Sequence, residues 1–183
     1  MTYTSGPYAG REIAYSCGGF DGGFTSTGLS VIDVTNKSNP ITLANESYSS
    51  PAYSHQAWLS DDRNYLFLND ELDETGSNQG RTIVFNVSDP GNPFQATTYT
   101  HGNTAVTHNL YVDGNRTFHS NYTAGLQIFD NTNPLSPVET GFFDTAPDSE
   151  TVTYNGLWSN YPYFPSGVAV SYTHLTLPTT YGV

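Results

Sequence analysis

Short runs of alternating apolar and polar residues recur along the chain. Three of them share one outline, in which the run ends at Asp or Asn and a proline follows seven residues later. The three runs are 28–34, 82–87 and 125–130. The alternation predicts β-strands, because successive side chains of a strand face opposite sides of a sheet. The Asp or Asn can start a turn by bonding nearby backbone, and the proline prevents the strand from continuing.

The spacing of these strands predicts a repeat protein. The strand ends Asp33, Asn86 and Asp130 lie 53 and 44 residues apart. A period of this length filled with short strands is typical of propeller blades, which are small sheets that must stack because both faces are apolar. We therefore predict an all-β fold, a β-propeller fragment of about three to four four-stranded antiparallel blades. The predicted blades lie near residues 12–50, 54–100, 107–145 and 154–170.

A second repeat carries the candidate chemistry, a polar residue three positions before an aromatic one. It occurs three times. The pairs are His55 with Trp58, His108 with Tyr111, and Asn155 with Trp158. Because blades are related by rotation about one axis, we expect His55, His108 and Asn155 to form a ring around a central channel.

Such a ring suggests metal binding. Neutral histidines that face a channel could bind Zn, Cu or Fe, and carboxylates at the next strand end could complete the site. The nearby acidic residues are Asp70, Glu71, Asp73 and Glu74. These hard oxygen donors could instead bind Ca²⁺, although the spacing of an EF-hand is absent. Equally, the polar residues could fix the register of neighbouring blades, and the acidic cluster could be a solvated loop.

Other catalytic signatures are missing from the sequence. It contains neither a G-x-S-x-G nor an H-E-x-x-H motif. We expect His101, His119 and Cys17 to be structural. The glycine-rich segment 17–28 is followed by a strand pattern and not by a helix, so we predict a hairpin loop there and no phosphate site. The inner aromatic residues, which include Tyr161, Tyr163 and Phe164, are expected to pack between blades or to form a platform for carbohydrate or peptide.

Composition narrows the possible partners and locations. The 14 Tyr, 10 Phe and 2 Trp favour strands, and the net charge of -12 disfavours nucleic acid and suits cations. A single cysteine allows no internal disulfide. The sequence has no apolar run of about 18 residues that could span a membrane. It also begins without the basic and apolar regions of a signal peptide, so either the protein is cytosolic or its true beginning lies elsewhere.

Several segments, in order, resemble the choice-of-anchor B family, whose repeats are of the LVIVD type. They are GPYAGREIAY, SHQAWLSDDRNYLFLNDELDE, THNLYVDGNRTFHSNYTAGLQIFD, FFDTAP and NGLWSNYPYFPSG. The resemblance covers roughly residues 6–170 and implies a bacterial exported β-propeller, at the cell surface or secreted, of unestablished activity. It also implies that repeats and an export signal precede Gly6. Residues 171–183, which include His174, depart from the family pattern and resemble an adaptor-derived, non-native tail.

The sequence thus supports two main functions. The first is a non-catalytic exported propeller that binds a protein, peptide or carbohydrate and is stabilised by a divalent cation, either Ca²⁺ or a transition metal. The alternative is a metal-dependent enzyme with a channel site around His55 and His108. A purely structural surface protein is a third possibility. Channel geometry distinguishes them, because converging metal ligands favour the enzyme and histidines bonded to backbone favour the binding module.

Overall fold

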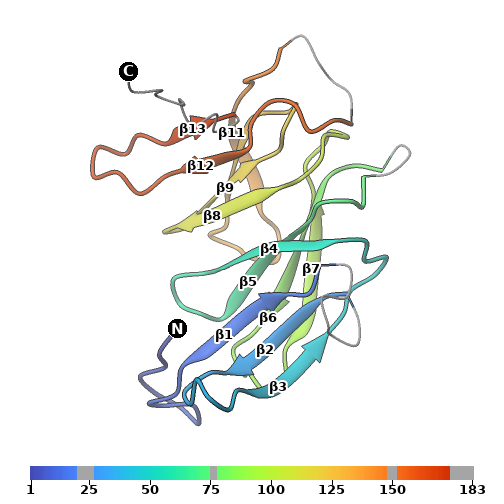
Figure 1. The fold of residues 1–183 in the computed structure, drawn as a ribbon. Helices are drawn as coiled ribbons and strands as arrows, with labels where there is room; N and C mark the ends of the chain where they lie inside the picture. Colours follow the sequence, from blue (N-terminus) through green and yellow to red (C-terminus); the bar gives the residue numbers. More distant parts are fainter. Residues whose placement is uncertain (20–26, 75–77, 148–151, 174–183) are drawn as a thin grey trace, which may run out of the picture.

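Over the residues that the structure describes, the chain folds into four antiparallel sheets, which lie next to one another in the order of the sequence (Figure 1). The computed structural model describes residues 1–19, 27–74, 78–147 and 152–173, and no helix occurs in these ranges. Most of the predicted glycine-rich loop and His174 with the rest of the predicted tail lie outside the described residues.

The described residues contain thirteen strands. They are β1 (Ile13–Cys17), β2 (Leu29–Asp33), β3 (Ile41–Glu46), β4 (Ser54–Leu59), β5 (Tyr65–Asp70), β6 (Arg81–Asn86), β7 (Phe94–Thr100), β8 (Asn109–Asp113), β9 (Arg116–Ser120), β10 (Leu126–Asp130), β11 (Val138–Phe143), β12 (Ser159–Tyr161) and β13 (Val170–Tyr172). Blade 1 comprises β1–β3, blade 2 β4–β7, blade 3 β8–β11 and blade 4 β12–β13. The predicted all-β, propeller-type fragment is confirmed, and the described sheets do not close into a ring.

The turn between the last two strands of each of blades 1 to 3 forms as the sequence predicts. The side-chain oxygen of Asp33 accepts a hydrogen bond from the backbone N–H two residues later, and so do those of Asn86 and Asp130. The outermost strands β3, β7 and β11 begin directly after the predicted prolines. In all three sheets the pairing of the last two strands shifts register near its middle. The repeat in the sequence is therefore a repeat in backbone geometry.

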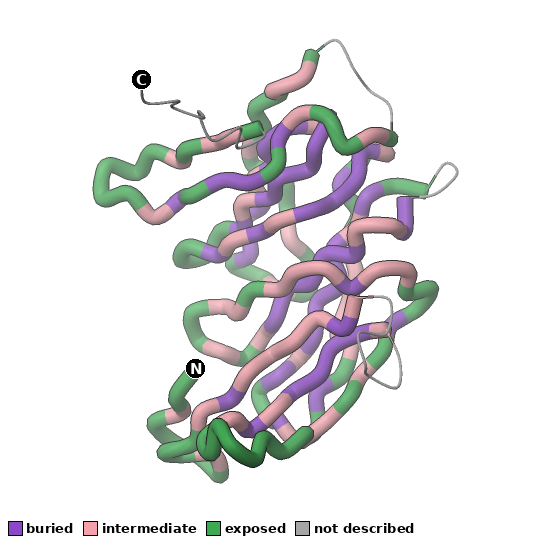
Figure 2. Tube along the Cα trace, in the orientation of Figure 1, coloured by how far each residue is buried: buried purple, intermediate pink, exposed green. Residues whose placement is uncertain are grey.

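The central strands β5 and β6 of blade 2 are buried over most of their length, which explains why their middle residues read as nearly continuous apolar runs (Figure 2). On β5, Leu66 and Leu68 pack toward Ile13 and Val31 of blade 1, whereas Phe67 packs toward blade 3. Burying one such side chain completely stabilises the fold by roughly 1.5–3 kcal/mol. The two clusters of the core thus lie between blades 1 and 2 and between blades 2 and 3.

The innermost strands β4, β8 and β12 lie next to one another and place the candidate site (Figure 1). In β13, Ser171 and Tyr172 pair with Asn160 and Ser159 of β12. The assignment of residues 171–183 to a non-native tail stays a prediction. None of the described residues belongs to a helix that could cross a lipid bilayer.

Candidate metal centre

Three potential metal ligands converge at the inner edges of blades 2 and 3. They are His55 in β4, Glu71 directly after β5, and His108 directly before β8, and one ligand atom of each lies within 4.8 Å of the others. The Nδ1 atom of His55 is 3.3 Å from one oxygen of Glu71, and the Nε2 atom of His108 is 3.7 Å from the other. The two imidazole rings stack with centroids 4.5 Å apart.

The local backbone explains this convergence. The pairing of β4 with β5 slips between Ser54 and Gln56, so His55 occupies a bulge. A bulge re-aims the side chain that it carries. Glu71 is anchored by its N–H, which donates to the carbonyl of Tyr53. Because sheet pairing fixes the three backbone positions, the side chains of His55, Glu71 and His108 lose little conformational freedom when they converge.

A hydrogen bond sets the tautomer of His108. Its Nδ1 atom lies 2.7 Å from the carbonyl oxygen of Trp158, which can only accept, so Nδ1 carries the proton. The lone pair on Nε2 then points toward Glu71, as in histidines that bind metals. Burial lowers the pKa of His108, with the bond to Trp158 opposing that shift, and keeps the ring neutral.

Tyr122 orients the carboxylate. Its hydroxyl donates a 2.8 Å hydrogen bond to Oε1 of Glu71, and burial raises the pKa of the phenol so that it stays protonated. The backbone of Tyr122 has a φ of 39°, an unusual conformation for a residue other than glycine. A Cβ on Gly156 would meet the carbonyl oxygen of Tyr122 at 2.2 Å, so only glycine permits this close approach. The position of the Tyr122 hydroxyl beside Glu71 therefore depends on the backbone as well as on side chains.

The three ligands fit a divalent metal ion. Their N–O separations of 3.3 and 3.7 Å are longer than a good hydrogen bond. Donors bonded at about 2.0–2.1 Å to a tetrahedral or octahedral ion lie about 2.8–3.4 Å apart, so the ligand atoms, which lie within 4.8 Å of one another, would move closer together on binding one. Two imidazoles and one carboxylate suit Zn²⁺ or Fe²⁺ better than Ca²⁺, which prefers oxygen ligands.

The other predicted acidic ligands lie elsewhere. Asp70 is fully buried and accepts hydrogen bonds from the Tyr48 hydroxyl and from three backbone N–H groups. Asp73 forms an ion pair with Arg81, and Glu74 accepts the N–H and hydroxyl of Thr107. Burial raises the pKa of Asp73 to about 6 and that of Glu74 to about 7. These carboxylates hold strand ends together, so the predicted acidic cluster does not gather around one ion.

Asn155 does not join the two histidines. The backbone of Ser54 bridges Gly19, and that of Leu157 bridges Tyr122, at equivalent positions of successive blades. The residue after Ser54 is His55, so its counterpart in blade 4 is Trp158. The sequence repeat aligned Trp158 with Trp58 and Tyr111, whereas the structure aligns Trp158 with His55. The third copy of the repeat was therefore misaligned by three residues. Asn155 is exposed, and no pattern in the sequence indicated the roles of Trp158 and Tyr122 beside the site.

A second histidine pair lies deeper between the same two blades. His101 and His119 are fully buried, and their ring nitrogens bond Thr82, Asn121, Tyr99 and Asn69. Burial lowers the pKa of His101 to about 3. This arrangement agrees with the structural role expected from the sequence.

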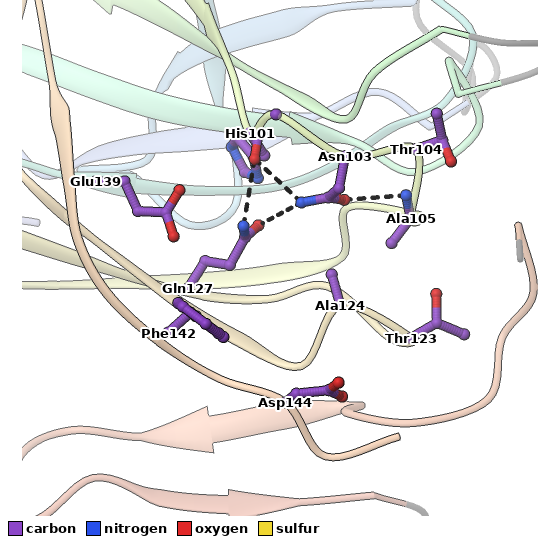
Figure 3. A pocket seen from close by; sticks show the side chains of 11 residues that line it. His101, Asn103, Thr104, Ala105, Thr123, Ala124, Gln127, Glu139, Phe142 and Asp144 are labelled. Carbon is purple, nitrogen blue, oxygen red and sulfur yellow. Dashed lines mark hydrogen bonds between the residues drawn. The ribbon is translucent and has the colours of Figure 1, made fainter. Parts of the chain in front are cut away.

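A cleft of about 570 Å³ opens beside this buried pair, between the loop 101–105 and β10 and β11 (Figure 3). Its floor is fixed by hydrogen bonds, because Gln127 accepts from Asn103 and both side chains donate to the carbonyl of His101. Glu139 stands at its rim, and none of the three metal-ligand candidates lines it. The cleft and the candidate metal centre are therefore different features of the blade 2 and blade 3 interface.

Comparison with known proteins finds the fold in enzymes. No family model matches the chain, and no curated protein sequence matches it. A periplasmic gluconolactonase of Pseudomonas aeruginosa is 14% identical with a TM-score of 0.57, over 88% of this chain and 47% of that one. A Bacteroides fragilis structure assigned as a 6-phosphogluconolactonase is 16% identical with a TM-score of 0.64, over 91% of this chain and 47% of that one. At these identities the likeness shows the fold alone, and the chain spans about half the length of each.

These findings correct the resemblance to the choice-of-anchor B family and its LVIVD-type repeats. No sequence comparison supports that family, and the two solved structures named above carry lactonase names. The segments that suggested it are strand ends, Asp-to-Pro turns and aromatic inner strands, which many stacked four-stranded sheets require. The prediction of a non-catalytic exported binding module is wrong for the same reason, and the enzyme alternative is the better supported of the two.

Proposed function

We propose that the chain carries the metal centre of a hydrolase that opens a cyclic ester. The observation that carries this proposal is the convergence of His55, Glu71 and His108, with the Nδ1 proton of His108 fixed on a carbonyl. The lactonase names of two proteins with this fold favour a lactone as the substrate. Because the chain spans about half of each, the activity of the complete protein is part of this proposal.

A divalent ion at these ligands would polarise the ester carbonyl and lower the pKa of a water molecule. In the reaction, the water oxygen bonds to the carbonyl carbon and the ring C–O bond breaks. The proton released by water ends on the departing ring oxygen, which gives a hydroxy acid with no other reactant.

The residues of the chain have separate tasks in this proposal. His55 and His108 supply neutral nitrogen donors from adjacent blades, and Glu71 supplies the negative charge that balances the ion. Tyr122 holds Oε1 of Glu71 in place, which leaves Oε2 directed at His55. The stacked sheets keep these groups at fixed separation, and such preorganised charges are the largest source of catalysis in many enzymes.

Location and partners belong to the same proposal. We propose an exported protein, because one of the two named neighbours is periplasmic. A small uncharged or cationic substrate suits the net charge of -12, and nucleic acid does not.

Metal analysis and lactone hydrolysis test the proposal together. The protein is stripped with a chelator, Zn²⁺ or Fe²⁺ is added back, and hydrolysis of glucono-1,5-lactone is followed by acid release. We expect one metal ion per chain, a higher melting temperature with metal and a metal-dependent rate. Glu71→Gln and His108→Ala should lower metal affinity by more than about 100-fold, since even outer residues of metal sites contribute about 10–100-fold.

The exposed variant Glu139→Gln serves as the matched control, because it removes the same charge at a distance from the centre. Its metal content and rate should equal those of the wild type. Hydrolysis that is insensitive to metal, or metal binding that survives Glu71→Gln, would exclude the assigned site.

A further inference from the structure

Trp158 stands at the third position of the row that begins with His55 and His108. Its indole ring lies 4.8 Å from the His108 ring and 5.8 Å from the Tyr122 ring, measured between centroids. Its main-chain oxygen accepts the Nδ1 proton of His108, so the backbone of this residue positions a metal ligand. The side chain remains 37% exposed.

A second exposed aromatic residue lies on the same side of the site. Tyr154 is 50% exposed and packs perpendicular to Tyr122, with ring centroids 5.3 Å apart. Tyr122 is itself buried and bonded to Glu71, so it backs the two exposed rings. The candidate centre therefore has an aromatic wall that reaches solvent beside His108.

Such a wall suits one class of ligand. Saturated rings stack their C–H faces on indole and phenol rings, which offer a large rigid contact at low entropic cost. An open-chain ester has no such face. The wall stands next to the proposed metal ion, which would bind the ester carbonyl. A ring stacked on the wall therefore places its ester beside the ion at His108.

The charged residues of the chain indicate whether such a ring ligand is neutral or phosphorylated. All five basic residues are described, and four have polar partners away from the site. Arg11 bonds Asp33, Lys37 bonds Glu12, Arg81 bonds Asp73, and Arg63 bonds the carbonyl of Thr2. The fifth, Arg116, begins β9, where it pairs across the sheet with Asp113 and Asp130. Among the described residues, Glu71 and Glu74 lie close enough to Tyr154 that their charges, after burial, raise the pKa of its phenol.

We infer that Trp158 and Tyr154 bind the face of an uncharged, hydroxylated ring and that the substrate is a neutral lactone and not a phosphorylated one. This inference rests on the proposed function, and it assigns to Trp158 the role of selecting a ring over an open chain. It also separates the two kinds of lactone named for the structural neighbours. The proposed metal ion would offset the charge of Glu71, and no basic side chain of this chain lies near the wall to meet a phosphate group.

Kinetics on three esters test the inference. Glucono-1,5-lactone, its 6-phosphate and the acyclic ester ethyl acetate are compared in the wild type and in Trp158→Ala. We expect KM for the neutral lactone to rise about tenfold in the variant, with kcat within about twofold, since aromatic stacking contributes on that order. The acyclic ester should be hydrolysed equally by both proteins, and the phosphorylated lactone should have the lower kcat/KM in the wild type.

Trp58 provides a matched control, because it is 38% exposed and packs on Tyr111, away from the three ligands. Trp58→Ala should leave all three esters unaffected. An unchanged KM in Trp158→Ala with normal metal content, or a preference for the phosphorylated lactone, would overturn the inference.

Ring binding can also be measured without catalysis, which separates this inference from the proposed function. In Trp58→Phe the fluorescence reports Trp158 alone, because the chain has two tryptophans. Titration with 1,5-anhydroglucitol, a ring without an ester, should change the emission, whereas its phosphorylated counterpart should not at equal concentration. A response without any lactone hydrolysis would retain the ring site and reject the hydrolase. The absence of any response would reject the ring site.

Discussion

Two pairs of histidines lie between blades 2 and 3, and they differ in whether their ring nitrogens are available to bind a metal ion. The rings of His55 and His108 stack 4.5 Å apart beside Glu71, and those of His101 and His119 meet edge to face at 4.7 Å. In the deeper pair all four ring nitrogens contact amides or hydroxyls. In the inner pair, one nitrogen of each ring faces a carboxylate at a distance that a metal ion would span.

The protonation of the deeper pair follows from its partners. The hydroxyl of Thr82 donates to Asn69, so it must accept the Nε2 proton of His101. The Nδ1 atom of His101 then accepts from the amide of Asn121. The imidazole ring of His101 is neutral in this state, and both of its nitrogens have hydrogen-bond partners. The comparison shows that burial and pairing make a histidine structural, whereas an oriented lone pair beside a carboxylate makes it available to an ion.

The largest difference between the pairs should appear in stability without metal. His119 is fully buried against Tyr99 and Phe129, so His119→Ala leaves a cavity and unpaired polar groups and should cost about 3 kcal/mol. The side chain of His55 is 25% exposed, so His55→Ala should cost less than about 1 kcal/mol. Urea unfolding of both variants in chelator measures this. Equal losses would remove the distinction between the pairs.

The deeper pair should also make the stability of the fold depend on pH. The pKa of His101 is about 3 in the folded protein against an ordinary value of 6.5, so the unfolded chain binds a proton that the folded one refuses. Stability from this residue is therefore lost as the pH falls from 6.5 toward 3, by about 1.4 kcal/mol per pH unit. Asp73 and Glu74 titrate with the opposite sign, because their raised pKa values let the folded state keep protons.

A variant isolates the contribution of His101 from those carboxyl groups. His101→Gln keeps a polar side chain but cannot titrate, so its deficit relative to the wild type should shrink as the pH falls from about 6 to about 4. Urea unfolding at each pH gives the difference in free energy. A deficit that is constant over this range would show that His101 protonates equally in both states.

The repeat in the sequence was enough to predict the sheets but not the site. Asp33, Asn86 and Asp130 determine their turns through bonds to residues two positions away, and such local chemistry is visible in a sequence. The convergence of His55 with Glu71 depends on a bulge in β4, and no residue type near His55 predicted that bulge. The sequence indicated both histidines and four carboxylates, and of these four the structure brings Glu71 close to both histidines.

The role of Trp158 was missed for a related reason. Its contribution to His108 comes from a main-chain oxygen, and the identity of a side chain does not reveal that. The positive φ of Tyr122 and the bare α-carbon of Gly156 are equally tertiary features. Sequence repeats align side chains along a blade, whereas the site is formed by contacts between blades.

Tyr122 offers the smallest and sharpest test of the inner pair. Tyr122→Phe removes one hydroxyl and its hydrogen bond to Glu71 while the ring still packs on His108 and Trp158. We expect metal affinity to fall about tenfold, because the carboxylate loses the donor that orients it. Competition with a chromogenic chelator measures the dissociation constant. Tyr111→Phe is the control, since its hydroxyl contacts Ser159 and not Glu71, and it should bind metal as the wild type does. If both variants bound metal equally well, Glu71 would need no support from Tyr122, and the inner pair would owe its geometry to the backbone alone.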